Sequence, residues 1–382
     1  MIPIYLDNAA TTQVDPSVIE CLQSALSEGP ANPSSLHHRG RSARYSVERT
    51  TEQIGHCLGS VLDQPGGDRL IFTGSGTEAN NLVVQGLSQI QHYIISQIEH
   101  PSVLEVGKWL ERNGKSVSWL EATKAGTICL EHLEFLLSAS RNTSTLVSTM
   151  WANNETGILQ PIEKISLMCE EAHAKVHVDA TQCVGKIRLK LSNLNLTSIA
   201  FSAHKFHGPS GIGAAWISGG HSINPIMFGG EQQLETRPGT EPVALIAGMG
   251  HALTVACGSL EQTARHCQTL RNQLEHSLLE RFPDLVIQGA TAERLPGTSC
   301  ISFVGADRQS MLMALDLEGI ACSSGSACSS GSSPPSHVLS AMSRPKLEID
   351  SALRFAVSKF STSSEIEDSI ERISRVYKRL RR

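Results

Sequence analysis

A repeated order of short apolar run, turn and helical pattern constrains the fold of this chain more than any other feature. Five such units follow one another, and their apolar runs span 69–73, 92–96, 146–151, 176–179 and 198–201. Short apolar runs bounded by turn residues are typical of buried strands, and strands that alternate with helices form largely parallel sheets with helices on both faces. The sequence therefore predicts an α/β fold whose larger domain is built on such a sheet.

Polar residues stand at or just beyond the ends of these predicted strands. They are Thr77, His100, Asn154, Asp179 and Lys205. In open α/β sheets ligands bind beyond the carboxyl ends of the strands, so residues from separate units meet there. Considered singly, His100 also fits a hydrogen-bonded core histidine, and Asn154 also fits the cap of a turn. Their convergence on one edge of the sheet predicts a ligand site.

Lys205 and Asp179 indicate the kind of ligand. Lys205 comes shortly after the apolar run 198–201, and the turn at 208–211 cannot continue that strand. Partial burial disfavours the ammonium form of a lysine, lowers its pKa and makes the amine a nucleophile that can form a Schiff base. Asp179 ends another short strand. A Schiff-base lysine together with an acid for a pyridinium nitrogen is the pair that a pyridoxal phosphate (PLP) enzyme requires.

The segment 74–81 offers a possible phosphate site. It connects the strand predicted at 69–73 to a helix that begins at about Leu82, and it contains two glycines. Backbone N–H groups at such a turn are free to face a phosphate, and the helix dipole favours the negative charge. By itself the pattern is unspecific, because short glycine turns join strands to helices in any α/β protein.

Composition excludes several other classes of protein. The 382 residues carry a formal net charge of −5, which gives no electrostatic footprint for nucleic acid. The longest apolar segment, 243–258, is short for a bilayer and contains glycines and a histidine, so we expect a core helix and no membrane contact. The ten cysteines show neither Cys-x-x-Cys pairs nor zinc-like spacing, so no metal site is expected. No signal peptide is recognisable, and we expect a cytoplasmic protein.

A smaller α+β domain is predicted beyond the apolar segment 243–258. Two short strands are expected there, at 285–287 and 300–303. Residues 323–336 then include eight serines, two glycines and two prolines, with Cys328 near the centre. Such a composition cannot bury a core and predicts a mobile loop.

Three parts of the chain follow from this order. Residues 1–15 form an N-terminal arm that we expect to pack with the small domain, residues 16–255 form the large domain, and residues 256–382 form the small domain that carries the loop. At this length two domains with a sizeable core are expected.

Three motifs resemble those of one enzyme family. They are Tyr-Leu-Asp-Asn-Ala-Ala-Thr-Thr at 5–12, Ser-Ala-His-Lys at 202–205, and Ser-Ser-Gly-Ser-Ala-Cys at 323–328. The chain resembles cysteine desulfurases of the NifS/IscS type, within the class-V aminotransferase group of PLP enzymes, from about residue 5 to residue 360. The resemblance implies PLP fold type I, with a seven-stranded, mostly parallel sheet in the large domain.

The resemblance also implies a role for each site residue. Lys205 would hold PLP and move the substrate's Cα proton, Asp179 would pair with the pyridinium nitrogen, and His100 would stack on the ring. Gln182 and Asn154 would contact the phenolic oxygen or groups near it. The residues implied for the phosphate are Gly76, Thr77, Ser202 and His204, with Thr240 reaching it from a partner subunit, so a homodimer is implied.

The substrate end follows from the same resemblance. Arg354 would bind the carboxylate of L-cysteine, with Asn154 nearby, although taken alone Arg354 also fits an ordinary surface arginine. Cys328 would accept the sulfur as a persulfide, while Cys322, beside an apolar run, is interpreted as packing. The implied products are L-alanine and a sulfur that passes to an acceptor protein, either an iron–sulfur scaffold or a thiolation relay.

Two other functions fit the same residues. One is a PLP-dependent carbon–sulfur or carbon–selenium lyase, or a transaminase, in which Cys328 takes no part. The other is a non-catalytic protein with a PLP-enzyme fold that serves as an interaction platform. Persulfide on the protein separates the first from a desulfurase, and a visible-range cofactor spectrum tests the second.

Overall fold

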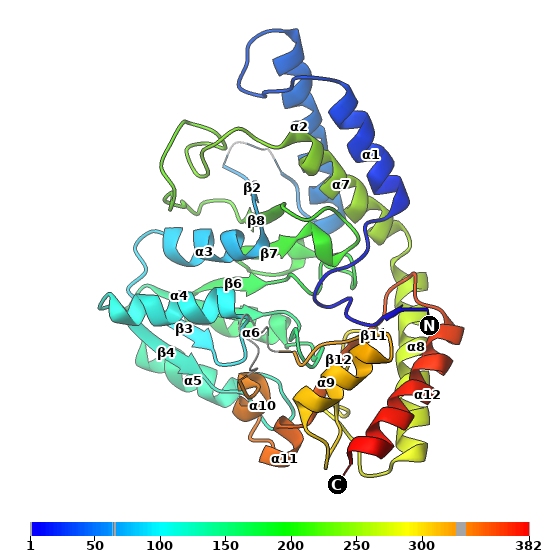
Figure 1. Ribbon diagram of the computed structural model, residues 1–382. Coiled ribbons are helices and arrows are strands. Elements are labelled where there is room, and N and C mark those ends of the chain that lie inside the picture. The colour runs from blue at the N-terminus through cyan, green and yellow to red at the C-terminus, as the bar shows by residue number, and fades with distance from the viewer. Residues whose placement is uncertain (1, 63, 65, 326–333, 382) are drawn as a thin grey trace.

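The computed structural model describes residues 2–62, 64, 66–325 and 334–381. Its largest element is a seven-stranded sheet in the order β2-β8-β7-β6-β5-β3-β4 (Figure 1). The strands are β2 (Arg69–Thr73), β3 (His92–Ser96), β4 (Ser116–Leu120), β5 (Thr145–Met150), β6 (Lys175–Asp179), β7 (Ser198–Ser202) and β8 (Gly213–Ile217). Six of these strands run in the same direction, and β8 runs opposite to them. The predicted mostly parallel sheet is confirmed, and β4 and β8 add to the five strands expected from the apolar runs.

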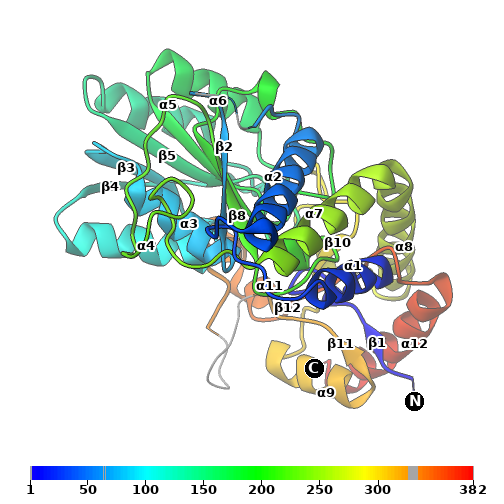
Figure 2. The ribbon, with the colours of Figure 1, turned by 90° about the horizontal axis from the view of Figure 1, so that it is seen from above.

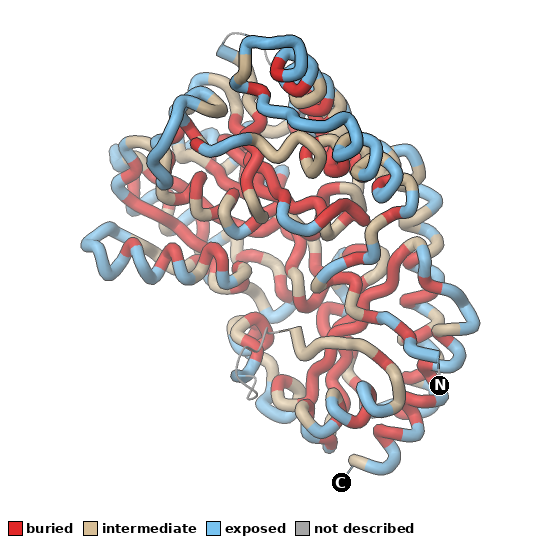
Figure 3. The backbone as a smooth tube through the Cα atoms, turned by 45° about the horizontal axis from the view of Figure 1, so that its top comes forward, coloured by how far each residue is buried: buried red, intermediate tan, exposed pale blue. Residues whose placement is uncertain are grey.

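Helices cover both faces of this sheet, as Figure 2 shows from above. On one face lie α3 (Gly76–Gly86) and α4 (Pro101–Arg112); on the other lie α1 (Pro16–Ser27), α2 (His38–Leu58), α5 (Leu130–Ala139), α6 (Ile162–Glu171) and α7 (Val243–Gly258). The side chains of successive strand residues point to opposite faces of the sheet. In β7, for example, Ile199 packs in the cluster that includes α1 and α2, and Ala200 packs in the cluster that includes α3 and α4. This arrangement explains why the strands read as continuous apolar runs: both of their faces are buried (Figure 3).

The apolar segment expected as a core helix is α7, which packs against α1 and α2. Within the described residues, no single helix has both the length and the apolar composition needed to cross a bilayer. One pair of helices in the described part of the chain meets the requirement jointly, α7 with α8 (Leu260–Arg281), and it is bent by 74°.

A second core gathers elements from the last third of the chain around a three-stranded antiparallel sheet. Its strands are β9 (Val286–Ile287), β10 (Thr298–Ser302) and β12 (Ala352–Ala356). Its helices are α8, α9 (Arg308–Leu317) and α12 (Ser363–Leu380), with the short α10 (His337–Ala341) and α11 (Lys346–Ile349) beside them. The expected α+β character of this part is confirmed.

The N-terminal arm joins this second core. Strand β1 (Ile4–Tyr5) pairs in parallel with β11 (Ile320–Ala321), and Asp7 forms an isolated bridge with Ala356 of β12. Ile4 and Leu6 are buried in the same hydrophobic cluster as α12. The predicted limits of the large and small domains stay a prediction, and the limit at 255–256 falls inside α7.

Candidate active site

A cavity of about 600 Å³ opens beyond the carboxyl ends of β5, β6 and β7. It also reaches the N-terminus of α3, the arm and β12. Ten of the residues predicted from the sequence line it: Gly76, Thr77, His100, Asn154, Asp179, Gln182, Ser202, His204, Lys205 and Arg354. Residues separated by up to 278 positions, Gly76 and Arg354 at the extremes, thus meet at one place.

Lys205 occupies the short 3₁₀ turn Ala203–Lys205 that directly follows β7. Its ammonium group donates hydrogen bonds to the backbone carbonyls of Ala9 (2.7 Å) and Ala10 (2.6 Å) in the arm. Burial lowers the pKa of Lys205 to about 7, and the nearby positive charges of Lys186 and Arg354 act in the same direction. A large fraction of the side chain is therefore a neutral amine near pH 7, which is the nucleophilic form.

Asp179 is the last residue of β6 and is buried, with only 6% of its surface exposed. Each carboxylate oxygen accepts one hydrogen bond from the protein, Oδ1 from the N–H of Thr181 (2.9 Å) and Oδ2 from Nδ2 of Asn80 (2.8 Å). Each oxygen keeps a lone pair for a further donor. The carboxylate is thus held in one orientation while it can still bind a protonated ring nitrogen.

The first turn of α3 forms a concave anion site. Ser75 caps this helix by accepting from the N–H of Glu78 (3.1 Å), while the N–H groups of Gly76 and Thr77 have no acceptor among the described residues. A Cβ atom added to Gly76 would lie 3.2 Å from Oγ1 of Thr181, so a side chain there would crowd the site. Free N–H groups at a helix N-terminus bind phosphate.

His100 is the N-cap of α4 and lines the cavity opposite Lys205's strand. Its Nδ1 lies 2.8 Å from Oγ of Ser102 and accepts from the N–H of the same serine (3.1 Å). Burial is the main reason that the pKa of His100 is lowered. A neutral imidazole is therefore the form present at pH 7.

Arg354 lies at the centre of β12 and is 5% exposed, so it is not an ordinary surface arginine. Its guanidinium donates to the carbonyl of Asn154 (2.8 Å) and to Oδ1 of Asp7 (2.7 Å). Among the described residues, the Nε of Arg354 and the buried Oδ1 of Asn154 have no partner. This end of the cavity therefore contains a buried donor and a buried acceptor that the described residues leave unsatisfied.

Comparisons with known proteins agree with this geometry. Residues 4–368 match the family model described as aminotransferase class-V. The chain belongs to the class-V aminotransferase family. It is 38% identical to a cysteine desulfurase of Nostoc sp. over 99% of this chain and 94% of the relative, and 36% identical to the cysteine desulfurase IscS of Dictyoglomus turgidum over 99% and 95%.

Comparison with solved structures also finds a NifS-like protein. The NifS-like protein from Rickettsia africae superposes with a TM-score of 0.90 at 34% identity, covering 98% of this chain and 99% of that chain. The predicted resemblance to NifS/IscS-type proteins and the predicted fold are confirmed.

The cofactor of this family fits the residues present. Class-V aminotransferases depend on PLP. The cavity offers an amine for its aldehyde at Lys205, a carboxylate for its ring nitrogen at Asp179, and free backbone N–H groups for its phosphate at the start of α3. These three groups lie at the ends of three separate elements and face one space, which is the donor set that PLP requires.

Among the described residues, one predicted site residue does not line the cavity. Thr240 is exposed on the segment that precedes α7. Cys328 lies outside the described residues. Cys322 packs against the core of the small domain, and burial raises its pKa, as expected for a packing cysteine.

Sequence reasoning missed several polar residues of the cavity. Glu155 is almost completely buried and accepts from Oγ of Ser336 (2.5 Å), and its Oε1 lies 3.9 Å from Nδ1 of His337. Burial raises its pKa. Glu155 follows Asn154 directly, so the cluster of polar residues after β5 was its only sequence signal.

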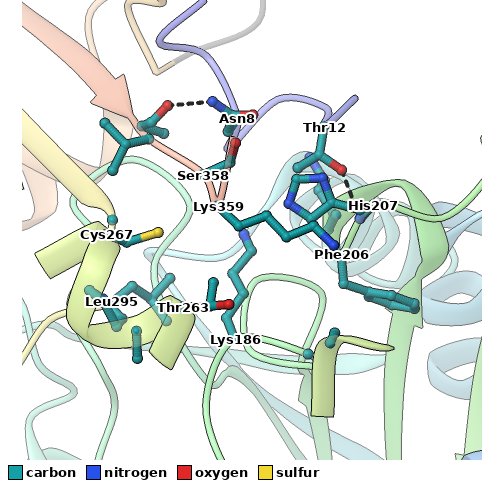
Figure 4. A pocket seen from close by; sticks show the side chains of 18 of the residues that line it. Asn8, Thr12, Lys186, Phe206, His207, Thr263, Cys267, Leu295, Ser358 and Lys359 are labelled. Atoms are coloured by element: carbon teal, nitrogen blue, oxygen red, sulfur yellow. Dashed lines mark hydrogen bonds between the residues drawn. The ribbon is translucent and has the colours of Figure 1, made fainter. Parts of the chain in front are cut away.

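A smaller cavity of about 60 Å³, also lined by Lys205, lies between the arm and α8 (Figure 4). Lys186 extends into it, and its ammonium group donates to Oε1 of Gln182 (2.8 Å). The amide nitrogen of Gln182 then donates to the carbonyl of Ala9 (2.9 Å), the same carbonyl that accepts from Lys205. Burial lowers the pKa of Lys186 to about 8. Lys186 therefore fixes which end of the Gln182 amide faces the arm.

Proposed function

We propose that this chain is a PLP-dependent cysteine desulfurase, which converts L-cysteine to L-alanine and retains the sulfur as a persulfide. The observation that carries the proposal is the convergence of Lys205, Asp179 and Arg354 on one cavity. A nucleophilic amine, a carboxylate and a buried guanidinium are the groups needed to bind an amino acid through a pyridoxal cofactor. The relatives named cysteine desulfurase narrow the substrate to L-cysteine.

The chain's own residues prepare the substrate. PLP, when bound, withdraws electrons from Cα and so weakens the bond between Cβ and sulfur. Lys205, with its pKa near 7, can take the Cα proton and return it. Asp179 keeps the ring nitrogen protonated, because its carboxylate is buried and fixed by two donors. Arg354 binds the carboxylate of the amino acid with a planar pair of N–H donors.

Sulfur transfer balances as a displacement at sulfur. The thiolate of Cys328 forms a sulfur–sulfur bond with the substrate sulfur while the Cβ–sulfur bond breaks. The electron pair of that bond stays with the carbon skeleton, which is protonated and leaves as L-alanine. One thiol and one L-cysteine thus yield one persulfide and one L-alanine, with no external oxidant. Cys328 is assigned by resemblance to the family's loop motif at 323–328.

Partners and compartment belong to the same proposal. Thr240 is exposed and does not line its own cavity, which supports a homodimer in which it reaches the partner's phosphate site. The persulfide is passed to an acceptor protein, either an iron–sulfur scaffold or a thiolation relay. A cytoplasmic location fits a free thiol that has to stay reduced between turnovers.

Persulfide mapping tests the proposal. The purified protein is incubated with L-cysteine, alanine release is measured, and sulfur adducts are located by peptide mass spectrometry. We expect the adduct on Cys328. The Cys328→Ser variant should lose the adduct and most alanine release while keeping the visible spectrum of bound cofactor.

The Cys322→Ser variant is the matched control, since this thiol is partly buried against the small-domain core and its pKa is raised. It should keep most turnover. An adduct on Cys322, or full alanine release from Cys328→Ser, would overturn the desulfurase mechanism and favour a lyase that does not use Cys328.

A further inference from the structure

A line of buried hydrogen bonds runs beneath the cavity from the sheet to α4. Oγ of Ser198 lies 2.9 Å from Nδ1 of His177, and Nε2 of His177 lies 3.0 Å from Oδ1 of Asn80. The Asn80 amide continues to Oγ of Ser102 (2.8 Å), which meets Nδ1 of His100 (2.8 Å). The line connects β7, β6, α3 and α4, and Ser198, His177 and Asn80 are at most 1% exposed.

Asp179 fixes the orientation of the Asn80 amide. Nδ2 of Asn80 lies 2.8 Å from Oδ2 of Asp179, and a carboxylate can only accept hydrogen bonds. Rotating the amide by half a turn would place two acceptor oxygens 2.8 Å apart, which is strongly unfavourable in a buried site. One hydrogen of Nδ2 therefore goes to Asp179 and the other to Ser102, and Oδ1 faces His177.

The oxygen of Asn80 in turn fixes the state of His177. Because Oδ1 accepts, Nε2 of His177 has to carry a hydrogen. Burial lowers the pKa of His177 to about 4, so the ring is neutral and its Nδ1 is an acceptor. The hydroxyl of Ser198 donates to that nitrogen. This end of the line thus holds Asn80 from the side opposite Asp179.

Two independent contacts fix the state of His100. The hydroxyl oxygen of Ser102 accepts from Asn80 and gives its single hydrogen to Nδ1 of His100. The backbone N–H of Ser102 donates to the same Nδ1 (3.1 Å). An atom that two donors face is an acceptor, so the hydrogen of the neutral ring is on Nε2. Within the described part of the chain, Nε2 has no hydrogen-bond partner.

We propose that Asn80 is a positioning residue which, through one amide group, orients the Asp179 carboxylate and, together with the backbone N–H of Ser102, places the hydrogen of His100 on Nε2. The carboxylate that would bind the ring nitrogen of PLP and the imidazole predicted to stack on that ring are thereby set by the same side chain. His100 then offers a donor, and not an acceptor, to a group in the cavity. The consequence for PLP rests on the proposed function, whereas the hydrogen-bond directions rest on the described contacts alone.

The tautomer of His100 is measurable without any substitution. Holoenzyme labelled with ¹⁵N-histidine is studied by long-range ¹H–¹⁵N correlation spectra, and His100 is assigned by the signals that a His100→Gln variant lacks. We expect the pattern of a neutral ring protonated on Nε2 at pH 7 for both His100 and His177. A hydrogen on Nδ1 of His100, or a protonated ring, would overturn the proposal.

Substitution of Asn80 then tests whether this residue is the cause. Asn80→Asp keeps the shape but cannot donate to Asp179 and Ser102 together, and Asn80→Leu removes both donors. In each variant the dissociation constant for PLP, measured by adding PLP to cofactor-free protein, should rise roughly 10- to 100-fold, since donors to a charged group are lost. The His100 signals should shift toward a mixture of tautomers.

Asn153→Ala is the control for a structural effect alone. Asn153 is equally buried, but its side chain serves the turn that follows β5: it donates to the carbonyl of Ile98 and accepts from the N–H groups of Glu155 and Thr156. This variant should lower stability and leave the His100 tautomer unchanged. An unchanged tautomer and unchanged PLP affinity in both Asn80 variants would refute the role of Asn80. Absence of alanine release with the expected tautomer would refute the proposed function only.

Discussion

The two ends of the active-site cavity differ in how completely their polar atoms are paired. At the end proposed to hold the cofactor ring, called the ring end, the Asp179 carboxylate and the Asn80 amide are hydrogen-bonded to each other. Asp179 also accepts from the N–H of Thr181, and Asn80 is also bonded to His177. At the substrate end, the Nε of Arg354 and the Oδ1 of Asn154 have no partner among the described residues, and a second guanidinium nitrogen is paired with Asp7 of the arm. The ring end is therefore held by hydrogen bonds, whereas the substrate end contains buried polar atoms without a partner and an ion pair with the arm.

This difference matches what each end has to do. A cofactor that stays bound through many turnovers is best served by dipoles that are fixed in advance, since no reorganisation is then needed during reaction. A substrate that enters and leaves needs groups that exchange partners. The ion pair between Arg354 and Asp7 is such an exchangeable contact, because an incoming carboxylate can take the place of the Asp7 carboxylate.

The largest expected effect is at the ring end, where Lys205→Ala removes the amine. Covalent attachment of PLP should be lost, and alanine release should fall by about 10³-fold or more, since both the nucleophile and the proton carrier are absent. Borohydride reduction followed by intact-protein mass measures the attachment. Cofactor still fixed to the Ala variant after reduction would remove Lys205 from the mechanism.

At the substrate end, Arg354→Ala should reduce kcat/KM for L-cysteine by about 10- to 100-fold, because a charge-assisted contact worth roughly 1.5–3 kcal/mol is lost. The dissociation constant for PLP should change little, which separates the two ends. Steady-state kinetics and a PLP titration measure the two effects.

Arg294→Ala serves as the matched control for Arg354. It is also a buried arginine, paired with Glu275 at 2.7 Å, but it lies outside the cavity lining. It should lower the free energy of unfolding without changing KM. Equal losses of kcat/KM in both variants would show that Arg354 acts through stability alone.

A smaller effect is expected from Lys186→Met, which removes the partner of Gln182 Oε1 and a positive charge near Lys205. We expect kcat to fall roughly 2- to 10-fold, because Gln182 keeps its bond to Ala9 and one hydrogen bond is worth about 0.5–1.5 kcal/mol. The pKa of Lys205 in the cofactor-free protein should rise. Lys190→Met, at an exposed position nearby, should change neither quantity.

The last expected effect is on stability and not on catalysis. In the cofactor-free protein the pKa of Lys205 is about 7, whereas an unfolded lysine has a pKa near 10.4. Between these values the unfolded chain binds more protons, so the contribution of Lys205 makes the free energy of unfolding rise with pH, by at most about 1.4 kcal/mol per pH unit. Urea unfolding at pH 7 and pH 9 should show a steeper rise for wild type than for Lys205→Met. Equal slopes would contradict the buried, neutral amine.

Sequence patterns predicted the site residues that stand at strand ends, but not those whose role depends on contacts between distant parts of the chain. Lys205 and Asp179 could be predicted because each stands at or just beyond the end of an apolar run. In parallel sheets, residues that follow the carboxyl ends of the strands lie close together. Asn80 and Lys186 were missed. The role of Asn80 depends on its hydrogen bond with His177, which is 97 positions away in the sequence. No local sequence pattern predicts a contact between residues so far apart.

The same limit applies at the substrate end. Arg354 entered through family resemblance, and its contact with Asp7, 347 positions away, depends on the arm lying beside β12. The strands β4 and β8 were missed for a simpler reason: Ser116–Leu120 includes partly exposed positions, and Gly213–Ile217 contains a glycine and two alanines, so neither forms a conspicuous apolar run.

The pairing of β1 with β11 has a consequence for the order of folding. Ile4 pairs with Ile320, which lies 316 positions later in the sequence. The hydrogen bonds of the first strand therefore cannot form until nearly the whole chain has been synthesised. Contacts of such sequence separation form slowly, because a long loop has to close first. Until then the arm lacks its pairing with the small domain, and Arg354 of β12, which lines the cavity, is not yet in place beside Asp7. Nascent chains should therefore acquire the large sheet before they acquire a cavity able to capture the cofactor.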